Sequence, residues 1–169
     1  ISVTNGTVAL RLALHCIGVR ANDEVIIPPL SFVATANSIA HLGAHPHFVD
    51  IENKSLGLCP KALKNRLKEI GEIKNGLLFN KETGRRIAAI SLVHVFGYPA
   101  DILEIIKISR EWNLPVVEDA AEALGSWVFK NNKKIHCGLF GEIGIVSFNG
   151  NKLITTGGGG AIITNNQNL

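Results

Sequence analysis

The chain of 169 residues contains no methionine and only three cysteines. Cys16, Cys59 and Cys137 are widely spaced and form no Cys-x-x-Cys pair, so neither a zinc site nor a disulfide framework is signalled. Unpaired thiols fit a reducing compartment, and we expect a cytoplasmic protein. No apolar run reaches the roughly 18 residues that a membrane-spanning helix needs, and no signal peptide is visible.

Charge is also scarce. Charged residues make up 18% of the chain and the net charge is only +3, with lysines and arginines scattered rather than striped. Residues 61–68 and 130–134 are locally basic, but they are typical of a solvated helix face and a hairpin tip. We therefore expect no nucleic-acid partner. The six histidines show no ligand triplet, since His45 and His47 have no third partner, and we expect no metal site.

Apolar residues are abundant, at 46%, and they fall into short runs that alternate with helix-forming segments. The pattern predicts a hairpin over residues 127–137, with Ser31 and Asp101 as helix caps. The predicted strands cover residues 24–27, 46–49, 86–95, 115–118, 143–147 and 161–164, and the predicted helices cover 8–17, 31–41, 61–70 and 102–112. This alternation is typical of one α/β domain with a mostly parallel central sheet.

A lone lysine stands out on the connection between the last two predicted strands. Lys152 is surrounded by small and hydroxyl side chains and is followed by four glycines at residues 157–160. An amine in such a place suits Schiff-base formation with a carbonyl. Taken alone, however, a lysine in a glycine-rich loop is more often a solvated turn residue.

Other candidates follow different strands. Asp119 comes directly after one strand, Phe32 follows another across a Pro-Pro turn, and Ser147 begins the segment that ends at Lys152. Because ligands of α/β sheets bind outside the carboxyl ends of the strands, these residues predict one pocket.

Four ordered blocks resemble the DegT/DnrJ/EryC1/StrS family of pyridoxal-phosphate-dependent sugar aminotransferases. The blocks are Thr4-Asn5-Gly6-Thr7, Pro29-Leu30-Ser31-Phe32-Val33-Ala34-Thr35-Ala36-Asn37, Glu118-Asp119-Ala120-Ala121-Glu122 and Ser147-Phe148-Asn149-Gly150-Asn151-Lys152. The segment from Val93 to Asp101 is also similar to the family's Gly-x-Pro-Ala-Asp connection. The resemblance covers essentially the whole chain. It implies a fold-type I architecture with three layers and pyridoxal 5′-phosphate as cofactor.

The resemblance also implies roles for individual residues. Lys152 matches the Schiff-base lysine, and Asp119 matches the carboxylate that pairs with the pyridine nitrogen. Phe32 matches the aromatic that stacks on the cofactor ring. The phosphate group would be bound by three further residues, namely Gly6, Thr7 and Ser147. The simpler interpretations are a helix cap for Asp119, ordinary core for Phe32 and plain capping for the phosphate residues.

Glu122 and His94 are further candidates for the pocket. Glu122 matches a family position near the phenolic oxygen of the cofactor, where a carboxylate needs a proton or a neighbouring donor. We interpret it as a cofactor-contacting residue. His94 ends a buried strand, and a core histidine with satisfied hydrogen bonds is the favoured interpretation.

The family resemblance further implies a reaction. A branch of the family replaces the Schiff-base lysine by histidine and dehydrates sugars, and Lys152 argues against that branch. The expected reaction moves an amino group from L-glutamate to the keto carbon, C4, of a nucleotide-linked deoxysugar for surface glycans. Residues 76–86 and 29–32 look most like the branch that acts on UDP-4-keto-6-deoxy-N-acetylhexosamines, of the legionaminic-acid or bacillosamine type.

Two other functions stay open at this point. One is a non-catalytic relative that binds pyridoxal phosphate or a sugar nucleotide as a sensor. The other is a plain nucleotide-binding α/β domain, which the absence of Gly-x-Gly-x-x-Gly and P-loop motifs disfavours. We also expect residues 1–169 to be part of a large domain that lacks its N-terminal helices and a C-terminal small domain. The full-length protein would be a homodimer, and the isolated piece would be inactive.

Overall fold

The computed structural model describes residues 1–167. A seven-stranded sheet forms its centre, with strand order β1-β11-β10-β7-β6-β2-β3. Strands β10, β7, β6, β2 and β3 pair in parallel. At one edge β11 is antiparallel to both of its neighbours, β10 and β1. The strands are β1 (Ser2–Val3), β2 (Glu24–Ile27), β3 (His45–Phe48), β6 (Ile87–Val93), β7 (Val116–Asp119), β10 (Ile143–Ser147) and β11 (Gly160–Ile163).

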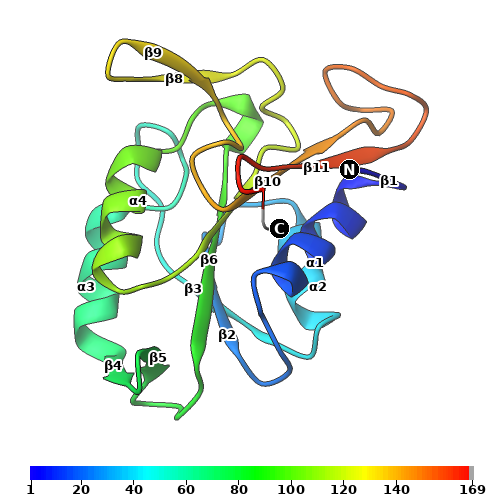
Figure 1. Ribbon diagram of the computed structural model, residues 1–169. Coiled ribbons are helices and arrows are strands. Elements are labelled where there is room, and N and C mark those ends of the chain that lie inside the picture. The colour runs from blue at the N-terminus through cyan, green and yellow to red at the C-terminus, as the bar shows by residue number, and fades with distance from the viewer. Residues whose placement is uncertain (168–169) are drawn as a thin grey trace.

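Helices cover both faces of the sheet, α1 and α2 on one side and α3 and α4 on the other (Figure 1). They are α1 (Gly6–Cys16), α2 (Val33–Ala40), α3 (Pro60–Ile70) and α4 (Ile102–Glu111). Because side chains alternate along a strand, Val25 and Ile27 of β2 pack into the α1/α2 core, whereas Ile26 packs into the α3/α4 core. The predicted three-layer α/β architecture with a mostly parallel sheet is confirmed.

The N-terminal ends of the helices are determined mainly by the residues at and next to the cap position. Asn5 caps α1, because its side-chain oxygen accepts from the backbone N–H of Val8 at 2.8 Å. Pro60 occupies the first turn of α3, where no N–H partner is needed. The expectation that Ser31 caps the second helix is wrong. The cap position is Phe32, which provides no side-chain hydrogen bond, and the Ser31 hydroxyl instead donates to the Phe32 carbonyl.

Two hairpins extend from this core. The hairpin of β8 (Trp127–Lys130) and β9 (Lys133–His136) was predicted, whereas that of β4 (Gly71–Lys74) and β5 (Leu77–Asn80) was not. Strand β4 is largely exposed and polar, so it gives no apolar alternation. Its turn residues, Asn75 and Gly76, both have left-handed backbones (φ 51° and 77°), and Asn-Gly is a strong hairpin signal.

The first and last strands of the described chain meet at the antiparallel edge. Strand β1 pairs with β11, and the amino group of Ile1 donates to the Ile162 carbonyl at 3.0 Å (Figure 1). The start of α1 also lies against β10, so closely that a side chain at Gly6 would place its Cβ 3.0 Å from that of Ser147. No helix among residues 1–167 is long and apolar enough to cross a bilayer.

Candidate active site

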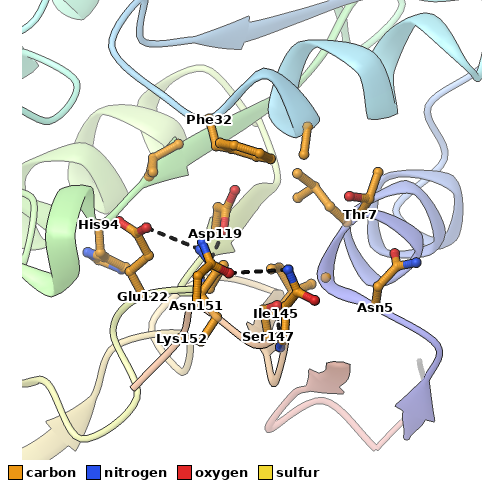
Figure 2. Close-up of a pocket in the computed structure, with 16 residues that line it drawn as sticks. Asn5, Thr7, Phe32, His94, Asp119, Glu122, Ile145, Ser147, Asn151 and Lys152 are labelled. Atoms are coloured by element: carbon orange, nitrogen blue, oxygen red, sulfur yellow. Dashed lines mark hydrogen bonds and ion pairs between the residues drawn. The ribbon is translucent and has the colours of Figure 1, made fainter. Parts of the chain in front are cut away.

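A cavity of about 300 Å³ opens where β6, β7 and β10 end and where α1 and α2 begin. The cavity thus lies at the C-terminal ends of the parallel strands, where α/β folds bind their ligands. All seven residues predicted for the site line this cavity, namely Gly6, Thr7, Phe32, Asp119, Glu122, Ser147 and Lys152. Figure 2 shows the side chains converging from α1, α2 and the strand ends.

Lys152 points into the cavity with 11% of its side chain exposed. Its Nζ lies 3.1 Å from Oε1 of Glu122 (Figure 2) and 5.9 Å from the centre of the Phe32 ring. The backbone N–H of Lys152 donates to the Asn149 carbonyl, which fixes the turn that carries the lysine. The solvated-turn interpretation is therefore wrong for this amine, which is nearly buried and has an acidic partner.

Asp119 ends β7 and is buried in the wall of the same cavity. One carboxylate oxygen accepts from the Ala121 N–H and the other accepts from the Thr35 hydroxyl, both at 3.1 Å. Burial raises the pKa of Asp119, and the two donors together with the charge of Lys152 oppose that rise. A cationic group close to the carboxylate would hold it in its charged form.

The start of α1 forms another wall of the cavity. Gly6 and Thr7 lie in the first turn, whose N–H groups have no partners within the helix, and the helix dipole there favours an anion. Ser147, at the end of β10, lies directly against Gly6. A phosphate group would therefore meet N–H donors from the helix and a hydroxyl from the strand.

Glu122 bridges two parts of the site. Its Oε2 accepts from the Phe96 N–H at 3.0 Å, while Oε1 accepts from Lys152. Phe96 has a left-handed backbone (φ 53°), which is rare for a bulky residue, and Gly97 follows with φ 78°. This tight turn holds one oxygen of Glu122 in place, so the other oxygen stays directed at the lysine.

Sequence reasoning assigned no role to Glu118, a buried neighbour of Asp119. One of its oxygens accepts from the N–H groups of Phe140 and Gly141, both at 2.6 Å, and the other accepts from the N–H of Gly138 at 2.8 Å. His94 is its side-chain partner, with Nε2 at 3.0 Å. Burial by itself raises the pKa of Glu118, but these hydrogen bonds outweigh it and lower the pKa.

His94 lines the cavity and is also a core histidine with both nitrogens bonded. Its Nδ1 lies 3.1 Å from the N–H of Ala100, and since a backbone N–H can only donate, this nitrogen carries no proton. The Nε2–H therefore donates to Glu118. The pair ties the 94–100 connection to β7 and to the loop before β10.

The DegT/DnrJ/EryC1/StrS aminotransferase family model matches residues 1–169. A crystal structure of a DegT DnrJ EryC1 StrS aminotransferase from Brucella abortus is similar at 32% identity with a TM-score of 0.85, covering 99% of this chain and 42% of that one.

Two curated relatives are also similar. The GDP-perosamine synthase of Escherichia coli O157:H7 is 38% identical over 168 residues, which is 99% of this chain and 41% of the relative. The L-glutamine:scyllo-inosose aminotransferase of Streptomyces griseus is 33% identical over 169 residues, or 35% of its own length. The chain thus spans well under half the length of the curated relatives it matches.

Proposed function

Since the chain belongs to the DegT/DnrJ/EryC1/StrS aminotransferase family, we propose that the full-length protein is a cytoplasmic transaminase that aminates a nucleotide-linked deoxysugar at its keto carbon, C4. The cofactor is pyridoxal 5′-phosphate, and residues 1–169 form part of the large domain that binds it. One observation carries this proposal: Lys152 and Asp119 come from different strand ends and line a single cavity (Figure 2).

The residues of the cavity fit this cofactor group by group. Gly6, Thr7 and Ser147 would hold the phosphate, because they offer N–H donors and a hydroxyl at a helix start. Phe32 would lie against the ring, and Asp119 would accept a hydrogen bond from the ring nitrogen. When bound, pyridoxal 5′-phosphate supplies an electron sink that stabilises negative charge on the carbon next to the transferred nitrogen.

Proton transfer would be the task of Lys152. Its Nζ would take a proton from the substrate carbon and return a proton at the other end of the reacting system. The Glu122 carboxylate, 3.1 Å from Nζ, would hold the amine in position beside the reacting atoms. Because Glu122 is itself fixed by the Phe96 N–H, it would keep Lys152 directed into the cavity.

The nucleotide that the sugar substrate carries is predicted from other parts of the chain. The resemblance to the UDP branch rested on residues 29–32, of which Phe32 lines the cavity, and on residues 76–86. Residues 76–86 form β5 and the turn that enters the amino end of β6. The cavity lies at the opposite, carboxyl end of β6, seven residues further along the chain. Residues 76–86 therefore do not line this chain's own cavity, which weakens the UDP assignment. The name of the E. coli relative favours a GDP-linked sugar instead.

A substrate panel tests the proposed function. We expect the full-length protein, given L-glutamate or L-glutamine, to aminate a GDP-linked 4-keto-6-deoxy sugar with a higher kcat/KM than the UDP- or dTDP-linked sugars. The amino donors are compared in parallel because the S. griseus relative is named for L-glutamine. A UDP preference would restore the sequence-based prediction. Binding of cofactor and sugar nucleotide without turnover of any of them would instead indicate a sensor.

We also propose that the full-length protein is a homodimer that buries the rim of the cavity. Several large apolar side chains beside the cavity are exposed, and Leu153 and Phe96 are the most exposed among them, at 74% and 81%. Leu153 directly follows the lysine, so a second copy packed there would also exclude water from the site. We expect a dimer mass by light scattering, and Leu153→Asp should shift the protein towards monomer. A stable wild-type monomer would contradict the proposal.

A further inference from the structure

Helix α2 carries two hydroxyls that are wholly buried, Thr35 and Ser38. A helix face packed against a sheet is normally apolar, because a buried hydroxyl is costly unless it is hydrogen-bonded. Both of these have partners in the cavity wall. Ser38 Oγ donates to the Thr7 carbonyl at 3.2 Å, and Thr35 Oγ1 donates to Oδ2 of Asp119 at 3.1 Å.

These contacts follow from helical spacing. Phe32 is the cap residue of α2, and positions 32, 35 and 38 succeed one another at intervals of three, which places them on one face. Phe32 itself lines the cavity. A single helix face thus supplies the ring-stacking candidate, a donor to Asp119 and a contact to the phosphate-binding turn.

The Asp119 carboxylate is held at both of its oxygens. The Ala121 N–H comes from the same strand end, whereas the Thr35 hydroxyl reaches it from a helix 84 residues earlier in the chain. Two donors on different oxygens fix the plane of a carboxylate. The remaining lone pairs are then available on the side of Asp119 that lines the cavity.

We propose that Thr35 is a positioning residue that aims the Asp119 carboxylate at the ring nitrogen of pyridoxal 5′-phosphate, an inference that rests on the proposed function. Thr35 does not line the cavity and would not touch the cofactor itself. It acts by fixing the direction of one carboxylate oxygen and by stabilising its negative charge.

The Thr35 hydroxyl is one of the groups that help to keep the buried Asp119 carboxylate charged. Burial raises the pKa of Asp119, and the Ala121 N–H, the Thr35 hydroxyl and the charge of Lys152 work against it. His94 also faces this region, and its electrostatic effect on the pKa of Asp119 acts in the same direction as that of Lys152. The neighbouring Glu118 is turned towards His94 and the 138–141 loop. Loss of the Thr35 donor therefore raises the pKa of Asp119 further.

The test measures the affinity of the full-length protein for pyridoxal 5′-phosphate between about pH 6 and pH 9. Thr35→Val keeps the shape and removes the donor, and we expect affinity to fall about tenfold to a hundredfold. The deficit should grow as the pH falls, because Asp119 in the variant becomes protonated at a higher pH than in the wild type. Thr35→Ser keeps a hydroxyl and should restore most of the affinity.

A matched control is available in Ser91, a buried residue whose hydroxyl has no hydrogen-bond partner within residues 1–167. Ser91→Ala removes a buried hydroxyl without removing a hydrogen bond, so its affinity should equal that of the wild type. If Thr35→Val does not fold, Thr35→Ala takes its place in the same measurements.

A deaza analogue, with CH in place of the ring nitrogen, isolates the inferred contact. The wild type should bind the analogue more weakly than pyridoxal 5′-phosphate, and Thr35→Val should bind the analogue as well as the wild type does. Equal losses for both compounds would mean that Thr35 has only a structural role, which overturns this inference and leaves the proposed function intact. A wild type that binds neither compound would overturn both.

Discussion

Replacing Lys152 with alanine should lower the transamination rate of the full-length protein by at least about 10³-fold, within the range that general acid–base catalysis supplies. The nearly buried amine lies in the same cavity as Asp119, and no other lysine within residues 1–167 lines that cavity. The other titratable side chains of the lining, Asp119, Glu122 and His94, are each held by other hydrogen-bond partners. The rate of amino transfer from L-glutamate in single-turnover experiments measures the effect.

A covalent readout separates the loss of chemistry from a loss of folding. Borohydride reduction of the wild type with pyridoxal 5′-phosphate should label Lys152, and Lys152→Ala should show no labelled lysine by peptide mapping. Lys133→Ala, on the exposed β8–β9 hairpin, is the control and should retain both the label and the activity. Labelling of another lysine in the wild type would contradict the assignment of Lys152.

The second large effect is expected on stability, from Glu118→Ala. The carboxylate accepts three backbone N–H groups and the Nε2–H of His94, and all of them would lose their buried partner. Removing one member of a buried charged network typically destabilises a protein by about 3–5 kcal/mol. Urea denaturation of the full-length protein should show this decrease in the free energy of unfolding. An exposed matched change, Glu104→Ala, should stay within about 0.5 kcal/mol of the wild type.

The same residue makes the stability depend on pH. The pKa of Glu118 is lowered in the folded protein from its ordinary value of 4.5. Its contribution is therefore fully present above that ordinary value and is lost as the pH falls through the lower, folded value. The stability gap between wild type and Glu118→Ala should narrow in that acidic range. A gap that is unchanged there would show that the contribution of Glu118 is not that of its ionised form.

Much of the fold was predictable because its signals are local. Strands β2 and β10 contain short β-branched apolar segments, and the structure places them at the predicted residues 24–27 and 143–147. Strand β1 was missed because its two residues have no pattern of their own and depend on pairing with β11. The edge of the sheet is therefore set by tertiary contacts rather than by propensity.

In the site, too, some residues were predictable from local sequence signals and others depend on tertiary contacts. The seven residues identified from the family blocks all line one cavity, although their individual roles stay predictions. Thr35 and Glu118 lie inside those blocks, yet nothing local indicated their function. Their partners, Asp119 and the pair His94 and Gly138, are 84, 24 and 20 residues away, and only the folded chain brings them together.

The contact between Gly6 and Ser147 has a consequence for biosynthesis. The first turn of α1 has no opposite wall until β10 has been made, and β1 has no pairing partner until β11 has been made. Because translation proceeds from the N-terminus, a nascent chain that stops before these strands has no complete pocket. Both walls of the pocket are therefore present only after residues 143–163 have been synthesised.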